Sequence, residues 1–260
     1  MGLFKKKREN VYSGKYKNYG YAYGGDDDAL MFSVKEAYKA IRTNITLSVI
    51  KDGCRRLVFT SAIPSEGKST TSLNVAVSLA QAYSKVLLID CDLRKPRMHR
   101  AFGLSNSVGV TNVLSGLATA QQAIQKSKFE NLDVLSSGLI APNPSEMLAS
   151  DRMRDLITAL SEQYNYIIMD TPPINVVSDA LPLIKISDGV IFVVRQNYST
   201  HGELQSALSR LEFIQAKVIG IVVNSSSEHE TRKYKSISKY ADKINKPEKM
   251  HYTSGDNSNG

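Results

Sequence analysis

The sequence has 260 residues, 42% of them hydrophobic, and a formal net charge of +8 at pH 7. This length fits one α/β domain or two small ones, and the spacing of the strands favours one. We see no apolar run near the ~20 residues that span a bilayer, and the two cysteines lack metal-site spacing. We therefore expect a cytoplasmic protein whose association with the membrane is peripheral.

Residues 1–28 form a basic, tyrosine-rich leader with almost no aliphatic side chains. Such a segment cannot build a core, so we expect it to be disordered. Its positive charge fits an anionic membrane surface at least as well as DNA, and we predict no nucleic-acid partner. The leader is either a low-complexity segment or a set of accessible phosphate acceptors: Tyr12, Tyr16, Tyr19, Tyr21 and Tyr23.

A helix is predicted to begin at Ser33, which has capping-box spacing to Glu36. Apolar residues follow at helical spacing: Val34, Ala37, Ile41, Ile45 and Val49. Three charged residues recur on a neighbouring face: Glu36, Lys39 and Arg42. That face is either a plain charged surface or a pairing face for another subunit.

The stretch 57–70 has the pattern of a phosphate-binding loop. An apolar run precedes a turn through Pro64, Ser65 and Gly67, and an amphipathic helix begins at Lys68. Backbone N–H groups and the helix N-terminus would bind an anion. Lys68 would reach the β- and γ-phosphates, and the Ser69 hydroxyl would ligate Mg²⁺. The predicted ATP contacts are Ser65, Glu66, Gly67, Lys68, Ser69 and Thr70.

Five further apolar runs are predicted strands, at Lys85–Asp90, Asn131–Leu135, Tyr166–Asp170, Gly189–Val194 and Lys217–Asn224. They are continuous and not alternating, as strands buried on both faces require. Helical stretches lie between several of them, notably Ser145–Leu160 and Glu203–Gln215. We predict an α/β, P-loop NTPase-like fold: a doubly wound, mostly parallel sheet with helices on both faces, spanning residues 29–226. Residues 227–260 form a polar tail with a short helix near Arg232–Tyr240.

Two of these strands end in carboxylates, at the sheet edge where ligands bind. Asp90 and Asp92 follow one strand, and Asp170 ends another. Asp170 fits a metal site, while one of Asp90 and Asp92 would touch the metal and the other would take a proton from a tyrosine hydroxyl. Arg94 would steady the transferred charge, or meet an acidic acceptor together with Lys95. At the end of the last strand, the Asn224 amide would read the adenine edge.

On these residues, the chain resembles the bacterial protein-tyrosine kinases (BY-kinases) of the CpsD/CapB type, which govern capsule and exopolysaccharide synthesis. The resemblance runs from about Glu36 to Asn224. It is carried by Ser61-Ala-Ile-Pro-Ser-Glu-Gly-Lys-Ser69, Asp90-Cys-Asp-Leu-Arg-Lys-Pro96 with His99, Gly109–Gly116, Pro142-Asn-Pro-Ser-Glu146 and Tyr166-Ile-Ile-Met-Asp-Thr-Pro-Pro173. The second segment is the most specific, because ordinary P-loop proteins lack it.

The resemblance implies an ATP- and Mg²⁺-dependent tyrosine autokinase. It places Lys68 and Ser69 at phosphate and metal, Asp90 and Asp92 in a second acidic motif, and Asp170 in a third. It also implies a membrane-anchored activator of the polysaccharide co-polymerase type, which would hold the kinase at the inner face of the membrane. A ring of subunits that phosphorylate one another's tails, and a cognate phosphotyrosine phosphatase, complete the expected partners.

The chain departs from the family pattern at three places. Ser65 stands where the family usually has Gly, and Lys39 replaces the first Arg of a Glu-x-x-Arg-x-x-Arg helix. The C-terminal tail has three spaced tyrosines instead of a dense cluster: Tyr234, Tyr240 and Tyr252. We therefore predict that both tails supply candidate acceptors.

Two rival functions are consistent with the same motifs. One is a positioning ATPase of the ParA/MinD type, whose loop carries an extra lysine where this chain has Ile63. The other is a non-enzymatic, nucleotide-gated partner of a membrane complex, with the basic leader as its docking arm. The missing lysine and the tyrosine-rich ends favour the kinase.

Overall fold

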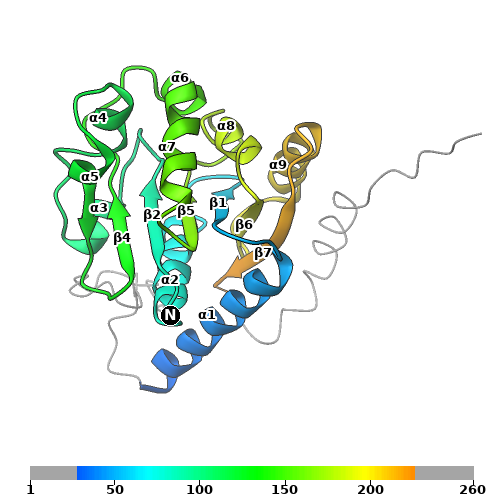
Figure 1. Cartoon of the computed structure of the whole chain (residues 1–260). Coiled ribbons are helices and arrows are strands. Elements are labelled where there is room, and N and C mark those ends of the chain that lie inside the picture. The colour runs from blue at the N-terminus through cyan, green and yellow to red at the C-terminus, as the bar shows by residue number, and fades with distance from the viewer. Residues whose placement is uncertain (1–27, 226–260) are drawn as a thin grey trace, which may run out of the picture.

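A seven-stranded sheet organises the part of the chain that the computed structural model describes, residues 28–225 (Figure 1). The strand order is β3-β4-β2-β5-β1-β6-β7. All neighbouring strands are parallel except β3 and β4, which pair antiparallel at one edge. The strands are β1 Arg55–Ser61, β2 Val86–Asp90, β3 Ile124–Lys126, β4 Leu132–Leu135, β5 Tyr166–Asp170, β6 Gly189–Arg195 and β7 Val218–Asn224.

Helices cover both faces of this sheet (Figure 1). The buried residues of α1 Asp28–Ser48, α2 Lys68–Ala80 and α3 Met98–Phe102 pack on one face. The other face is covered by α4 Val110–Leu114, α5 Ala120–Ala123, α6 Pro144–Ala149, α7 Asp151–Ser161, α8 Ala180–Lys185 and α9 His201–Phe213. The predicted fold class, a doubly wound and mostly parallel sheet, is confirmed.

Strand β2 shows why the strands read as continuous apolar runs. Its side chains alternate between the two cores, with Leu87 and Ile89 in one and Val86 and Leu88 in the other. All five residues of β2 are buried, and so are all five of β5. Because helices lie on both faces, neither set of side chains meets water, and both sets must be apolar.

Besides shifts of one or two residues at element ends, three features of the fold differ from the sequence prediction. The first helix begins at Asp28, so Ser33 lies inside it and not at its cap. The predicted helix Ser145–Leu160 is two helices, because Ser150 adopts an extended conformation and its hydroxyl accepts a hydrogen bond from the Met153 N–H. The short edge strand β3 was not predicted, because three half-exposed residues carry too weak a pattern.

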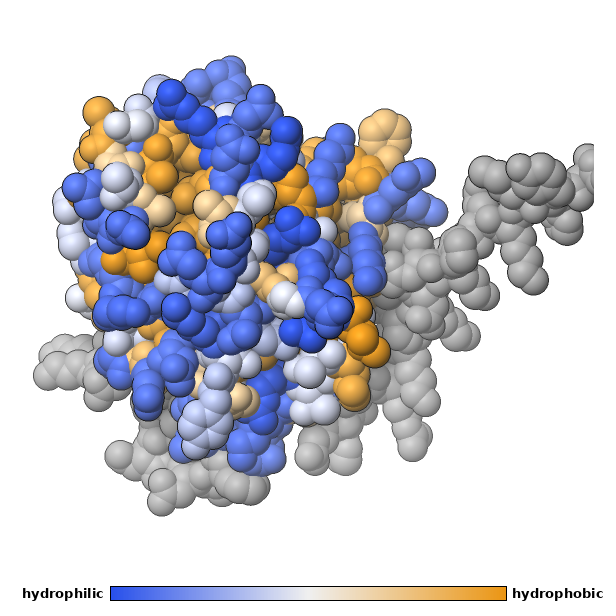
Figure 2. Space-filling model, in the orientation of Figure 1, coloured by the Kyte–Doolittle hydropathy of each residue, from blue (hydrophilic) through white to orange (hydrophobic). Residues whose placement is uncertain are grey.

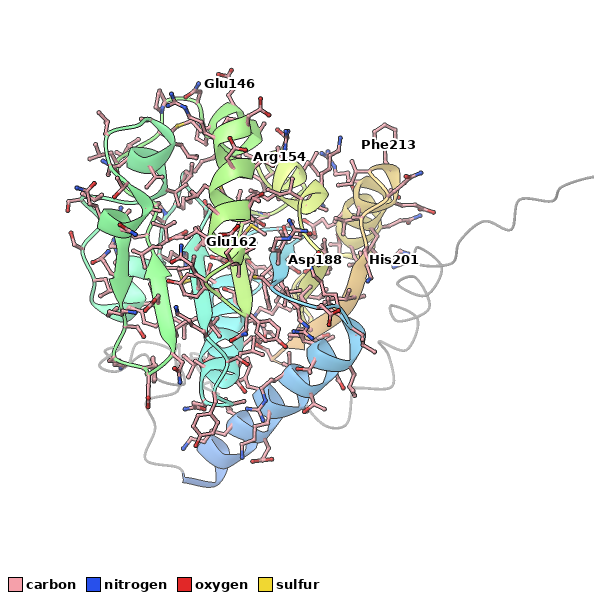
Figure 3. The ribbon with its side chains drawn as sticks, viewed as in Figure 1. Glu146, Arg154, Glu162, Asp188, His201 and Phe213 are labelled. Carbon is pink, nitrogen blue, oxygen red and sulfur yellow. The ribbon has the colours of Figure 1, made fainter. Side chains whose placement is uncertain are left out.

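The outer surface over α7 is largely hydrophilic (Figure 2). Arg154 of α7 and Glu162, which caps its C-terminal end, are exposed (Figure 3). Met153 and Ile157 of the same helix are buried. Of the helices in the described part of the chain, none is long and apolar enough to cross a membrane.

Several sequence predictions lie outside the described residues. These are the tyrosine-rich leader up to residue 27, the helix predicted near residues 232–240, and the polar tail from residue 226. The candidate acceptors in these segments are Tyr12, Tyr16, Tyr19, Tyr21, Tyr23, Tyr234, Tyr240 and Tyr252.

Candidate functional site

The order of three central strands brings distant residues together at one edge of the sheet. Strand β5 lies between β1 and β2, with Asp170 in register with Phe59 on one side and with Asp90 on the other. The loop that follows β1 therefore lies next to both acidic strand ends. The Thr171 hydroxyl donates to the Phe59 carbonyl at 2.9 Å and holds these ends together.

The loop between β1 and α2 contains two residues in the left-handed region. Ser65 has φ 67° and Gly67 has φ 91°. This explains why a glycine is usual at position 65 in the family that the sequence resembles, since L-residues adopt this conformation at a cost. At Gly67 a Cβ atom would push the Asn224 amide out of place, in addition to the strain of the left-handed conformation, so both effects favour glycine there.

Glu66 lies inside the loop, but its carboxylate faces away from the helix N-terminus. It is fully buried and accepts hydrogen bonds from the Ile63 N–H at 2.8 Å, the Ser199 hydroxyl and the Arg195 N–H at 3.4 Å. These donors compensate the buried charge. The side chain thus ties the loop to the connection between β6 and α9, and a direct role of Glu66 in anion binding is limited to its backbone.

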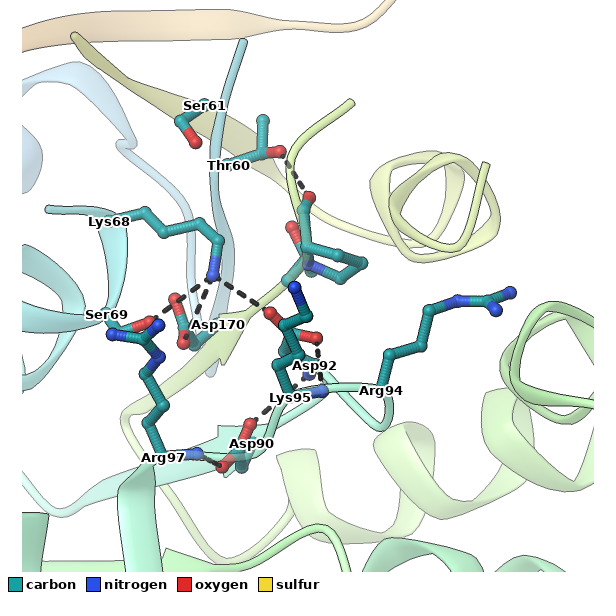
Figure 4. Close-up of polar contacts among 12 residues, drawn as sticks. Thr60, Ser61, Lys68, Ser69, Asp90, Asp92, Arg94, Lys95, Arg97 and Asp170 are labelled. Carbon is teal, nitrogen blue, oxygen red and sulfur yellow. Dashed lines mark hydrogen bonds and ion pairs between the residues drawn. The ribbon is translucent and has the colours of Figure 1, made fainter. Parts of the chain in front are cut away.

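Lys68, the first residue of α2, lies among carboxylates (Figure 4). Its Nζ is 3.2 Å from Asp92 Oδ2, 3.9 Å from Asp170 Oδ2 and 3.3 Å from Ser69 Oγ. The side chains of Lys68 and Asp92 are both 10% exposed. One ammonium group therefore faces two carboxylates and a hydroxyl at the N-terminus of a helix.

Asp170 is the least engaged of these carboxylates. It is 1% exposed, and neither of its side-chain oxygens accepts a hydrogen bond within the described part of the chain. Burial raises the pKa of this carboxyl group, and the neighbouring Lys68 ammonium opposes that rise. A buried carboxylate with free lone pairs is a suitable ligand for a hard cation and its waters.

Asp90 is engaged by the backbone of the loop that follows it. Its Oδ2 accepts from the Arg97 and Met98 N–H groups, both at 2.9 Å, and its Oδ1 accepts from the Asp92 N–H at 3.3 Å. Burial raises the pKa of Asp90 to about 7, with a further contribution from the Asp170 carboxylate. Asp90 thus holds the loop, and its oxygens are less available to a metal than those of Asp170.

Arg94 is not part of the lysine–aspartate cluster. Its guanidinium makes two bonds to the fully buried Asp179, from Nε at 2.8 Å and from Nη2 at 3.1 Å. Ser145 at the start of α6 also donates to Asp179. Figure 4 shows Arg94 extending away from Lys68. The structure therefore does not bring the predicted catalytic Arg94 to the phosphate-binding loop.

Asn224 also has a different partner from the predicted adenine base. Its Nδ2 donates to the Glu66 carbonyl at 2.8 Å and to the Thr71 hydroxyl at 3.1 Å. Both N–H groups of the amide are thereby used in hydrogen bonds to the loop and to the first turn of α2. The geometry favours a structural bond over the predicted base contact.

Comparison with known proteins agrees with this geometry. The sequence profile described as an AAA domain matches residues 65–222, which include the second half of the loop, Lys68 and the three aspartates. The chain is 43% identical to the tyrosine-protein kinase YwqD of Bacillus subtilis (strain 168) over 189 residues, or 73% of this chain and 80% of that one. The chain belongs to the family of bacterial tyrosine-protein kinases.

Other relatives of the kinase define the extent of the match. It is 33% identical to the tyrosine-protein kinase Wzc of Salmonella typhimurium (strain LT2), over 73% of this chain but 26% of that protein. Among solved structures, the kinase domain of the Escherichia coli tyrosine kinase ETK matches with a TM-score of 0.72 at 33% identity, covering 77% of this chain and 81% of that one. This fold implies that the kinase binds a nucleotide.

The positioning ATPases are similar to the kinase in fold alone. The cell division ATPase MinD of Pyrococcus furiosus matches with a TM-score of 0.56 at 24% identity, over 67% of this chain and 74% of that one. The predicted resemblance to the bacterial tyrosine kinases is thus confirmed, and the rival function has only this distant likeness.

The charged stripe of α1 does not point outward as one face. Glu36 and Lys39 are exposed and form an ion pair with each other at 2.7 Å. Arg42 is half-buried and donates from Nη1 to the Ser78 carbonyl of α2 at 2.8 Å. Of the predicted oligomer face, the structure therefore leaves Glu36 and Lys39 at the surface and fixes Arg42 within its own chain.

Sequence reasoning missed two residues that organise the site. Asp179, which binds Arg94, and Ser199, which binds Glu66, belong to loops after β5 and β6. Neither Asp179 nor Ser199 lies in a sequence motif. Asp179 is 85 residues from its partner in the sequence, and Ser199 is 133 residues from its partner. The buried acid Glu66 within a phosphate-binding loop was the one available signal, because such a charge requires partners.

Proposed function

We propose that the kinase is an ATP-dependent protein-tyrosine autokinase that regulates capsule and exopolysaccharide synthesis and export. The observation that carries the proposal is the position of Lys68, with its ammonium 3.2 Å from Asp92 and 3.9 Å from Asp170. The helix N-terminus and Lys68 attract phosphates, whereas the carboxylates favour a cation that accompanies them. A magnesium nucleotide satisfies both requirements.

We assign Mg²⁺ to Ser69 and Asp170. The support is the buried Asp170 carboxylate, whose oxygens accept no hydrogen bond from the described residues. The Ser69 hydroxyl, at the start of α2, lies on the same Lys68 ammonium as this carboxylate. Bound Mg²⁺ would neutralise phosphate charge and make the terminal phosphorus more electrophilic. Asp90, which the sequence also assigned to the metal, acts in this proposal by holding the loop backbone through Arg97 and Met98.

The proposed reaction transfers the γ-phosphoryl group of ATP to a tyrosine. A bond forms from the tyrosine oxygen to the γ-phosphorus, and the bond from that phosphorus to the β–γ bridging oxygen breaks, releasing ADP. Lys68 stabilises the negative charge on the transferred group. Asp92 takes the phenolic proton, since its carboxylate lies within 3.2 Å of the lysine that holds the phosphates.

We further propose that the kinase works with a membrane-anchored activator of the polysaccharide co-polymerase type, which places it at the inner face of the membrane. The support is that the matching part of Wzc is 26% of that protein, so a relative carries this domain in a much longer chain. Subunits would form a ring through the α1 face at Glu36 and Lys39, with Arg42 holding α1 against α2 of its own chain. A cognate phosphotyrosine phosphatase would reverse the modification.

The acceptors in this proposal are tyrosines of both tails, supplied by a neighbouring subunit. They are Tyr12, Tyr16, Tyr19, Tyr21 and Tyr23 in the leader, and Tyr234, Tyr240 and Tyr252 in the C-terminal tail. Mapping phosphotyrosines by mass spectrometry tests this assignment. Phosphotyrosine found solely within residues 28–225 would contradict it.

Incubation of the full chain with γ-labelled ATP and Mg²⁺, with and without the activator, tests the activity. Label on tyrosine supports the kinase, release of free phosphate alone indicates an ATPase, and bound ATP without either indicates a nucleotide-gated switch. The Lys68→Met variant is the control, because it removes the ammonium while keeping the apolar stem. A parent and a variant that label tyrosine at the same rate would refute the assignment.

A further inference from the structure

The loop that carries the acidic motif also presents a group of cations. Four basic residues occur between positions 94 and 100, and all four are exposed: Arg94, Lys95, Arg97 and Arg100. Arg94 is bound to Asp179. Across the part of the chain that the structure describes, Lys95 and Arg97 enter no ion pair.

The backbone beneath these two cations is held by the site itself. The Lys95 N–H donates to Asp92 Oδ1 at 3.0 Å, and the Arg97 N–H donates to Asp90 Oδ2 at 2.9 Å. Figure 4 shows the Lys95 and Arg97 side chains rising from the loop on the side where Lys68 lies, opposite to Arg94. The loop therefore holds the backbone of these two residues beside the reacting groups, and within the described part of the chain their positive charges enter no ion pair.

Two tyrosine-containing segments, one in each tail, carry opposite charge. Tyr19, Tyr21 and Tyr23 lie in the segment 18–28, which ends in three aspartates and contains no lysine or arginine. Tyr234 and Tyr240 lie in the segment 231–241, which contains four basic residues and no acidic one. Two cations beside the site would attract the first segment and repel the second.

We propose that Lys95 and Arg97 recognise the acceptor, that they select tyrosines followed by aspartates, and that Tyr19, Tyr21 and Tyr23 of a second copy are the preferred acceptors. This inference rests on the proposed kinase function. It narrows the prediction that both tails supply candidate acceptors, because charge complementarity ranks Tyr19, Tyr21 and Tyr23 above Tyr234 and Tyr240.

The attachment of the leader favours delivery to a second copy. The α1 helix contacts α2 through Arg42 and Ser78, ten residues beyond Lys68 and so about 15 Å along α2 from the site. Figure 1 shows α1 beginning at the end of the molecule away from that site. From Arg42 the helix runs back another fourteen residues, about 21 Å, to its start at Asp28. Tyr23 is five residues before Asp28, and this tether of at most about 18 Å is shorter than the path back to the site along the two helices.

Three synthetic peptides test the selection with the full chain: residues 18–28, the same peptide with Asp26, Asp27 and Asp28 replaced by asparagine, and residues 231–241. We expect kcat/KM for the first to exceed the other two by about tenfold at low salt, and the preference to shrink in 0.5 M NaCl (about a 4 Å screening length). The Lys95→Gln/Arg97→Gln variant should lose the preference with an unchanged KM for ATP.

The matched control is Lys128→Gln/Lys217→Gln, which removes two exposed cations before β4 and β7, at the opposite edge of the sheet. It should keep the preference. Equal use of the three peptides, or a preference that survives in Lys95→Gln/Arg97→Gln, would overturn the inference. So would a rise in the KM for ATP alone, since the cations would then serve the nucleotide.

Failure of the kinase function itself has a different signature, because no peptide would be labelled. Binding of fluorescein-labelled peptide 18–28 to the full chain, followed by anisotropy, then decides whether recognition occurs. Salt-sensitive binding that Lys95→Gln/Arg97→Gln weakens about tenfold supports the surface. Binding that this variant leaves unchanged, or no binding, refutes it.

Discussion

Replacing Asn224 with alanine separates two roles for this residue, holding the phosphate-binding loop or reading adenine. The change removes the hydrogen bonds from Nδ2 to the Glu66 carbonyl at 2.8 Å and to the Thr71 hydroxyl at 3.1 Å. Each is worth about 0.5–1.5 kcal/mol, so the loop loses about 1–3 kcal/mol of stabilisation. If the lost free energy destabilises the loop conformation that binds nucleotide, the affinity for nucleotide drops about 5- to 150-fold.

The decisive measurement compares ligands with different bases. Isothermal titration calorimetry in Mg²⁺ buffer should show the same fractional loss of affinity for ATP, GTP and inorganic triphosphate, because the loop contacts phosphates and not the base. Asn44→Ala, a change of the same type at an exposed position of α1, should have no effect. A loss confined to ATP would refute the reasoning and restore Asn224 as the adenine contact.

Three further outcomes follow from the site. Lys68→Met should reduce tyrosine phosphorylation by about a thousandfold or more with an unchanged circular dichroism spectrum, and a labelling rate equal to that of the parent would contradict the role of its ammonium. Ser65→Gly removes the strain of a side chain at φ 67° but gives the unfolded chain more conformational entropy, and the net effect should be a rise in Tm of about 2 °C. Ser115→Gly brings the same entropy cost at φ −81°, where there is no strain to remove, and should lower Tm. Burial raises the pKa of Asp90 from 3.8 to about 7, so between these pH values the folded state binds a proton that the unfolded state has lost. Without Mg²⁺ the free energy of unfolding should therefore fall as the pH rises through this range. A series of denaturation curves in which Asp90→Asn kept the same dependence on pH as the parent would refute this.

Local sequence was sufficient for the sheet, apart from the short edge strand β3, and for the loop. Strands buried on both faces must be apolar throughout, so β2 and β5 are recognisable without any knowledge of their neighbours. The loop can also be recognised from adjacent residues alone, because its left-handed positions and the helix that begins at Lys68 depend on the side chains next to them in the sequence. Asp90 and Asp170 were identifiable because a carboxylate at the end of such a run requires compensation.

The tertiary structure alone decided which of the polar side chains meet. Insertion of β5 between β1 and β2 places Asp170 beside a loop about one hundred residues earlier, and no periodicity encodes that order. Glu66, Arg94 and Asn224 carry the groups expected of a phosphate site, yet each is bound to a structural partner 85 to 158 residues away. A side chain's residue type sets what it can bind, but hydrogen bonds are short, and so the partner depends on which distant segment the fold brings within about 3 Å.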